Sequence, residues 1–271
     1  MAEHEQHLHP ISADGVLTFA RFAYPPNALS LCGPDHADEL FERTSAGVVD
    51  QDLRQISRGF EGAWPYLELI AGASRRADPL EHAVVDSYWI GGPLADRVPT
   101  RLLAAMVHDR FRIRAGSHHE ALQRAVAAGL APTHAFHVFV VYPWTGLLRE
   151  GHTSPSLRIL DSCRIRWGEV LEVDGDRALV ESNQLMIRLG GIELAAPTVE
   201  EVRIGRNGQT LLAGVQAGSC VAIHWDWICD QLDRRRLHLL QRNTFRCLEV
   251  VNGFLHDRDP DWSERFEPVL S

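Results

Sequence analysis

The sequence predicts an α+β protein in which an N-terminal all-α helical domain precedes a small β-barrel that ends in a C-terminal helix. Apolar residues recur mostly at helical spacing before residue 150, alternate with polar residues between Leu157 and Trp227, and form one helical stripe after Asp233. We therefore expect four regions: a flexible polar arm over residues 1–15, a helical domain over 16–150, a barrel plus helix over 157–254, and a tail over 255–271.

The helical domain is predicted from start and stop signals along the chain. A first helix through Thr18–Tyr24 is expected to halt at Pro25 and Pro26, and a second is expected to begin near Ala37. Further helix starts are expected at four capping residues, Asp50, Asp78, Thr100 and Ser117. This part of the chain should form a compact bundle.

The barrel is predicted from short alternating segments separated by turn dipeptides. These dipeptides are Asp174-Gly175, Gly190-Gly191 and Asn207-Gly208. Cys163 is expected to open the first strand of this region. Asp233 is expected to cap the closing helix and Gly253 to end it.

Composition limits the classes of partner. The formal net charge is -9, which disfavours nucleic acid and anionic membrane surfaces as partners. No apolar run is long enough to cross a bilayer and the start of the chain has no export signal, so we expect a cytoplasmic location. The 5 cysteines include no CxxC pair, so free thiols are expected rather than a disulfide framework or a structural zinc knuckle.

Two histidines in the helical half stand three residues apart. On a helix, His134 and His137 would share one face and could ligate one metal ion, with Cys32 as a speculative additional ligand. The alternative interpretation is that both imidazoles form hydrogen bonds within a packed aromatic region. The sequence leaves both interpretations open.

The second half resembles a known family. Cys163, Gly168 and Val170, then an Asp-Gly hairpin, then His224 on a later strand and a terminal helix, are similar in order to the HypC/HupF family of NiFe-hydrogenase assembly chaperones. The resemblance covers about residues 158 to 254. Residues 1 to 150 resemble an uncharacterised bacterial helical domain and add no mechanism.

The resemblance implies a fold and a function. It implies a small OB-like barrel in which Cys163 and His224 bind an iron fragment carrying cyanide and carbon monoxide, Fe(CN)2CO, or contact the large-subunit precursor of the hydrogenase or another maturation protein. Two positions depart from the family pattern. Cys163 is internal and has no free α-amine, and Trp167 stands where the family has proline.

Three functions follow as competing hypotheses. The first is a non-enzymatic maturation factor of NiFe-hydrogenase assembly, with Trp167, Trp225 and Trp227 as candidate partner-binding residues; the last two could instead plug the barrel end. The second is a metal-dependent enzyme that uses His134 and His137. The third is a non-catalytic scaffold. No nucleophile elbow, phosphate loop or HExxH motif favours an enzyme.

Overall fold

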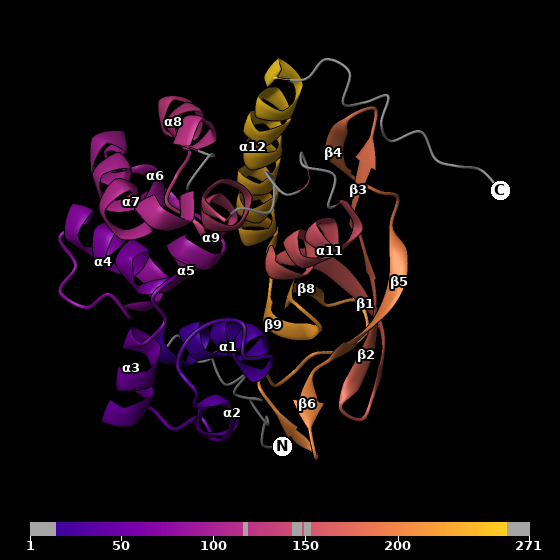
Figure 1. The fold of residues 1–271 in the computed structure, drawn as a ribbon. Coiled ribbons are helices and arrows are strands. Elements are labelled where there is room, and N and C mark those ends of the chain that lie inside the picture. The colour runs from indigo at the N-terminus through magenta and orange to yellow at the C-terminus, as the bar shows by residue number, and fades with distance from the viewer. Residues whose placement is uncertain (1–14, 116–118, 143–147, 149–152, 259–271) are drawn as a thin grey trace, which may run out of the picture.

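The computed structural model describes residues 15–115, 119–142, 148 and 153–258. Helices α1 to α8 lie on one side and the strands on the other, with α12 running along the boundary between them (Figure 1). The predicted α+β class, with a helical part, a barrel and a final helix in that order, is confirmed. One hydrophobic cluster includes side chains from both halves, so the helices and the outer face of the barrel are packed together.

Most of the chain before the barrel is helical. The helices are α1 (Gly15–Ala28), α2 (Ala37–Ser45), α3 (Gln51–Arg58), α4 (Trp64–Ala73), α5 (His82–Trp89), α6 (Pro93–Asp96), α7 (Thr100–Ala115), α8 (His119–Ala127), α9 (His134–Phe136), a π-helical turn η2 (His137–Val141), α11 (Thr153–Cys163) and α12 (Arg234–Arg258). None of these described helices combines the length and apolar character that crossing a membrane requires.

Several predicted helix boundaries are confirmed. The carboxylate of Asp50 accepts a hydrogen bond from the backbone N–H of Leu53 at 2.8 Å and caps α3. Asp233 caps α12 in the same way through the N–H of Arg236 at 2.7 Å. A helix begins at Thr100 as expected, whereas Ser117 lies outside the described residues.

Three predicted boundaries were wrong. Helix α1 continues through Pro25 and Pro26, because it is buried on all sides and packing outweighs the roughly 3 kcal/mol cost of helical proline. Asp78 binds the N–H of Leu80 at 2.9 Å but precedes the helix, which starts at His82. Helix α12 passes through Gly253 because the next two residues are buried in the core.

Five strands close into an OB-like barrel in the order β1-β2-β5-β9-β8. The pairs are antiparallel except β5 with β9, which run parallel where Arg203 faces Trp227. The barrel strands are β1 (Arg166–Asp174), β2 (Arg177–Ser182), β5 (Thr198–Arg203), β8 (Cys220–His224) and β9 (Trp227–Gln231). Two small hairpins extend from it, β3 (Leu185–Arg188) with β4 (Gly191–Leu194), and β6 (Gly205–Arg206) with β7 (Gln209–Thr210).

The hairpin signals in the sequence were correct to within one residue. The β1–β2 turn consists of Gly175 and Asp176, with Gly175 at a φ of 55°. In the β3–β4 hairpin the turn residues are Leu189 and Gly190, both at positive φ. Gly168 lies on β1, where a Cβ atom would stand 2.5 Å from a methyl carbon of Val180, so the barrel wall tolerates no side chain there.

A buried charged network joins the helices to the barrel. Asp230 of β9 pairs with Arg21 of α1 at 3.5 Å and with Arg236 of α12 at 2.6 Å. Arg236 also pairs with Asp86 of α5 at 2.7 Å. Four elements from both halves of the chain are therefore fixed relative to one another near the end of β9.

Candidate metal centre

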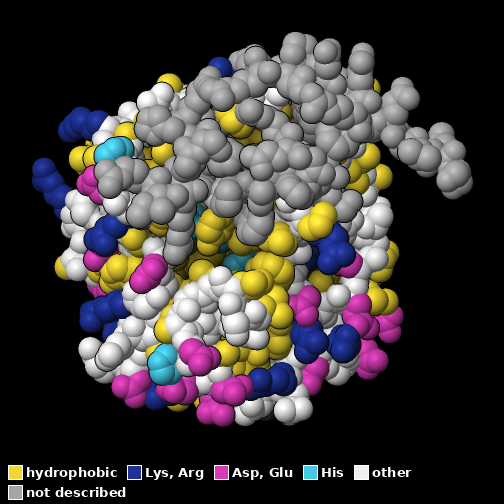
Figure 2. Space-filling view, viewed as in Figure 1, with side chains coloured by type: hydrophobic (Ala, Val, Ile, Leu, Met, Phe, Trp, Pro, Cys, Tyr) yellow, Lys and Arg dark blue, Asp and Glu magenta, His cyan; other side chains and the backbone are white. Residues whose placement is uncertain are grey.

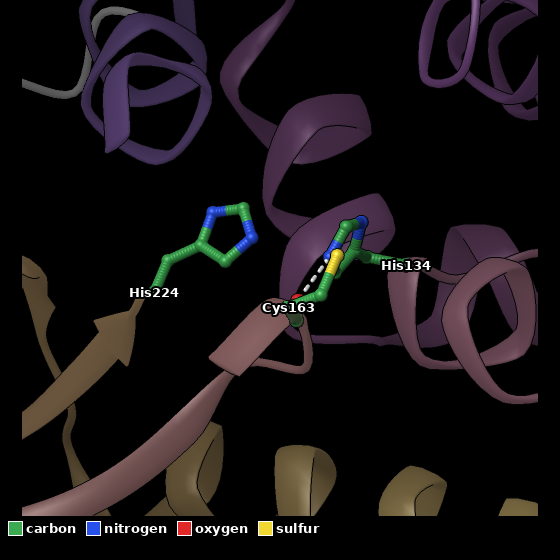
Figure 3. A group of neighbouring side chains, drawn as sticks. All are labelled: His134, Cys163 and His224. Atoms are coloured by element: carbon green, nitrogen blue, oxygen red, sulfur yellow. Dashed lines mark hydrogen bonds between the residues drawn. The ribbon is translucent and has the colours of Figure 1, made fainter. Parts of the chain in front are cut away.

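Three side chains that are far apart in the sequence meet where the helices contact the barrel. His134 comes from α9, Cys163 from the end of α11 and His224 from the end of β8. One ligand atom from each lies within 4.8 Å of the others. Figure 3 shows the His224 imidazole extending from the strand toward Cys163 and His134. A single ion could be bound by all three.

Cys163 is not on a strand, contrary to expectation. It is the last residue of α11, because the segment from Thr153 forms a helix and β1 begins only at Arg166. The helix end is tied to the β8–β9 turn by the N–H of Trp225, which donates to the Ser162 carbonyl at 2.8 Å. The Arg166 guanidinium donates to the carbonyl of Trp225. These two bonds hold Cys163 beside the end of β8.

His224 faces outward from the barrel, toward α1. Its strand neighbours Val221 and Ile223 fill the barrel interior, so alternation places His224 on the opposite face. Its Nδ1–H donates to the Phe22 carbonyl of α1 at 2.6 Å, which leaves the lone pair on Nε2. This Nε2 is buried and makes no hydrogen bond of standard geometry among the described residues, although the Cys163 backbone lies near enough to the ring to raise its pKa slightly against the effect of burial. Burial, and then the nearby His134, lower the pKa of His224 well below its ordinary value.

His134 is fixed by hydrogen bonds on both ring nitrogens. Its Nε2–H donates to the carbonyl oxygen of Cys163 at 2.8 Å, and its Nδ1 accepts from the Tyr88 hydroxyl at 3.3 Å. Burial lowers the pKa of His134 to about 4. The imidazole is therefore neutral at physiological pH, as a metal ligand must be. Because both nitrogens are hydrogen-bonded in the metal-free chain, ligation requires that His134 give up one of these two bonds.

The Cys163 thiol is held in its protonated form. Burial, and then the proximity of the Cys32 sulfur, raise the pKa of Cys163 well above its ordinary value. Without a cation the sulfur is thus a thiol at neutral pH and a poor nucleophile. A divalent metal ion would supply the positive charge that favours the thiolate.

One thiolate and two imidazoles suit a borderline or soft transition metal. Zinc, iron and cobalt accept this donor set, whereas magnesium and calcium require oxygen ligands. The backbone carbonyls that bind the ring N–H groups of His134 and His224 act as the outer shell that orients metal-binding histidines. Three protein ligands leave at least one coordination position for another group.

A cavity adjoins the three ligands. Its volume is about 660 Å³, and His134, Cys163 and His224 form part of its wall. The remaining wall is mostly aromatic and aliphatic, and it comes from α1, the loop after it, the segment before α4, α5, η2, α11 and the β8–β9 turn. Figure 2 shows hydrophobic side chains gathered near the middle of this face, with histidine among them.

His134 and His137 do not belong to one group of candidate ligands, and each ring instead lies beside a tyrosine hydroxyl, in line with the alternative interpretation of hydrogen-bonded histidines in a packed aromatic region. The chain forms a π-helical turn from His137 to Val141. His137 lies 3.0 Å from the Tyr66 hydroxyl through its Nδ1 and is not part of the three-residue group. Cys32 lines the cavity but is also outside that group.

The three candidate tryptophans do not form a common exposed face. Trp167 is buried and its ring lies near Arg164 and Phe245. Trp227 is buried with its ring centroid 5.0 Å from that of Tyr24. Trp225, at a φ of 55°, lines the cavity instead. The alternative expectation, that Trp225 and Trp227 plug this end of the barrel, is not met by Trp227, because its ring packs with the helices outside the barrel rather than with the interior cluster.

The sequence did not reveal the roles of Tyr88 and Trp89. Both lie on α5 and line the cavity, and Tyr88 also orients His134. Their apolar helical spacing identified them only as core residues. Only their capacity to donate hydrogen bonds from a buried position distinguishes them from ordinary core residues.

Comparison with known proteins identifies one family. Residues 11–258 match the model described as "Family of unknown function (DUF6390)", which spans both the helical part and the barrel. No curated protein and no solved structure gives a significant match.

Proposed function

We propose that this chain, which belongs to the DUF6390 family, is a metal-binding accessory protein that holds one transition-metal ion through His134, Cys163 and His224. The observation that carries the proposal is the convergence of the three ligand atoms within 4.8 Å. Their residues come from three separate elements, so no local sequence pattern accounts for the convergence.

The surroundings of His224 support metal binding over simple packing. A buried imidazole in a core is normally satisfied at both nitrogens, because an unmade hydrogen bond costs about 1–3 kcal/mol. Nε2 of His224 makes no hydrogen bond of standard geometry among the described residues, and it belongs to the same group as a thiol. Bound metal would satisfy that nitrogen and convert the thiol to thiolate.

A more specific role is assistance in NiFe-hydrogenase assembly. The closed barrel followed by α12, with a cysteine and a histidine side by side, supports the resemblance to HypC/HupF chaperones. Cys163 lacks the free α-amine of that family, and His134 offers a third donor in its place. In this role the cargo is an iron ion carrying cyanide and carbon monoxide, delivered to the large-subunit precursor.

The first experiment measures metal binding by the purified full chain. Cobalt(II) titration should produce one equivalent of bound metal and a thiolate-to-cobalt charge-transfer band in the near ultraviolet. Cys163→Ala should lose the band and most of the affinity. Cys220→Ala is the matched control, since Cys220 is a half-buried cysteine on the same strand as His224 but outside the group. If the cobalt spectra of Cys163→Ala and Cys220→Ala were the same, Cys163 would not be a metal ligand and the proposed metal centre would be refuted.

The second experiment tests the assembly role in the native host. Tagged wild type and Cys163→Ala are recovered and examined by infrared spectroscopy in the cyanide and carbonyl stretching region. Bands present in wild type and absent from the variant support iron-fragment delivery. Stoichiometric metal without bands and without a hydrogenase subunit would reject the assembly role and leave the metal centre.

A metal-dependent enzyme is the second candidate, and the cavity beside the ligands is the observation that favours it. Catalytic metal sites keep an open position next to a substrate pocket. A carrier releases its metal to a partner, whereas an enzyme retains it through turnover. Metal retention after incubation with host lysate therefore separates the two candidates.

A further inference from the structure

The cavity next to the metal ligands is much larger than the ion and small ligands would require. A water molecule occupies about 30 Å³ in the liquid, and a metal-bound diatomic ligand needs similar space. The cavity measures about 660 Å³, within the range of about 300–1,000 Å³ typical of pockets for organic ligands. Most of the space is therefore available to a larger molecule.

The cavity wall has no formal charge in the described part of the chain. None of its described lining residues is Arg, Asp or Glu. A carboxylate, phosphate or ammonium group placed there would lose hydration without gaining a counterion from the described residues, which is unfavourable. The metal ion could compensate for one anionic atom bound to it directly, but not for charge elsewhere in the cavity.

Two residues of the wall carry buried hydrogen-bond donors. The indole nitrogens of Trp89 and Trp225 are buried and have no hydrogen-bond partner among the described residues. Buried indole N–H groups normally find an acceptor. Trp225 is also held at a φ of 55°, a conformation that is strained for a bulky residue and is found often at ligand sites.

We infer that this cavity binds an uncharged, mainly apolar organic molecule that carries a hydrogen-bond acceptor, with the metal ion at one end of the site. The aromatic wall supplies contact area, and the indole N–H groups of Trp89 and Trp225 donate to the acceptor. The inference rests on the proposed function, because the metal ion completes the site. It goes beyond that function by assigning the class of ligand.

The test uses two probes of similar shape and different charge, cyclohexanone and cyclohexylammonium, neither of which carries an anionic atom that the metal ion could bind directly. Each is titrated by calorimetry into the cobalt-loaded full chain. Cyclohexanone should bind at least about tenfold more tightly than the cation, since an uncompensated charge costs more than 1.4 kcal/mol. Equal binding of the two probes, or tighter binding of the cation, would overturn the inference.

Variants locate the binding in this cavity. Trp89→Phe and Trp225→Phe should each weaken cyclohexanone binding about two- to tenfold, the effect of one lost hydrogen bond. Trp64→Phe is the control, because the Trp64 indole donates to Glu68 at 2.8 Å on the surface. Ala63→Phe should fill part of the cavity and reduce binding while the cobalt spectrum persists. Ala23→Leu provides a second filling variant if Ala63→Phe does not fold.

The outcomes separate this inference from the metal proposal. If cobalt binds and cyclohexanone does not, the ligand assignment is wrong and the metal centre stands. If cobalt does not bind, the same titration is made on the metal-free chain. Cyclohexanone binding that the filling variants abolish would then support the cavity assignment without the metal, and no binding would reject it.

Discussion

The Nε2–H of His134 donates to the backbone carbonyl of Cys163 at 2.8 Å, so one candidate ligand is hydrogen-bonded to the main chain of another. This bond connects α9 to the end of α11 before any ion binds (Figure 3). His224 is anchored independently through the Phe22 carbonyl at 2.6 Å. Both imidazoles are thus oriented by backbone acceptors, and the entropic cost of assembling the ligands is lowered.

The two histidines of the helical half should differ sharply when mutated. His134→Ala removes a ligand and should lower cobalt affinity at least about tenfold, by analogy with the loss seen on perturbing metal-site shells. His137→Ala should leave cobalt stoichiometry and spectrum unchanged, because His137 is outside the group. It should instead lower the free energy of unfolding by about 1–3 kcal/mol through its lost contact with the buried Tyr66. If His137→Ala lowered cobalt affinity and His134→Ala did not, the proposed set of ligands would be wrong.

The fold was largely predictable from the sequence and the site only in part. Alternation from Glu169 onward and the turn dipeptides identified the barrel hairpins, because those signals act between neighbours in sequence. The helical state of Thr153–Cys163 was missed, since its polar, proline-containing start is typical of a turn. Leu160 of this helix is buried in the core, and this packing favours the helical conformation.

The meeting of His134 with Cys163 and His224 was not predictable from spacing. The residues are separated by long stretches of chain, and their approach depends on how α9 and α11 pack against β8. The family resemblance marked Cys163 and His224 as candidate ligands, and the i,i+3 spacing with His137 marked His134 as part of a different site. Long-range packing determined which of these side chains lie together.

Metal binding should release one proton from the Cys163 thiol. Burial and Cys32 raise its pKa well above the ordinary value, whereas both histidine ligands are already neutral at pH 7. Zinc affinity should therefore rise about tenfold per pH unit between about pH 6.5 and 8. Calorimetry in buffers of different ionisation enthalpy measures the proton count. Cys163→Ala should show no proton release, and a wild-type count of zero would contradict thiolate ligation.

The metal-free chain should lose stability as the pH falls below neutrality. In the unfolded chain a histidine takes up a proton near pH 6.5, while folded His134 stays neutral down to a pKa of about 4. The unfolded state therefore binds more protons in this window, and His134 alone should cost roughly 3 kcal/mol of unfolding free energy by pH 4. Burial lowers the pKa of His224 in the same direction.

Urea unfolding in the presence of a chelator measures this effect at several pH values. His134→Gln cannot take up the proton, so its unfolding free energy should fall less steeply between pH 6.5 and 4.5 than that of the wild type. Parallel curves for the two chains would show that His134 titrates normally in the folded state.

Removing the carboxylate of Asp230 should destabilise both halves of the molecule together. Asp230 is buried and bonded to Arg21 and Arg236, so Asp230→Asn leaves the buried Arg21 guanidinium without its carboxylate, while Arg236 keeps Asp86. Breaking a buried ion pair in this way typically costs about 3–5 kcal/mol. The exposed pair of Arg203 with Asp226 is the control, and Asp226→Asn should cost at most about 1 kcal/mol.

Because one hydrophobic cluster includes both halves, helix signal and tryptophan fluorescence should shift to the same lower urea midpoint in Asp230→Asn. Separate midpoints for the two probes would indicate that helices and barrel unfold independently. If Asp230→Asn lowered the free energy of unfolding no more than Asp226→Asn does, Arg21 and Arg236 would be adequately solvated without Asp230. The network would then contribute little to holding α1 and α12 against β9.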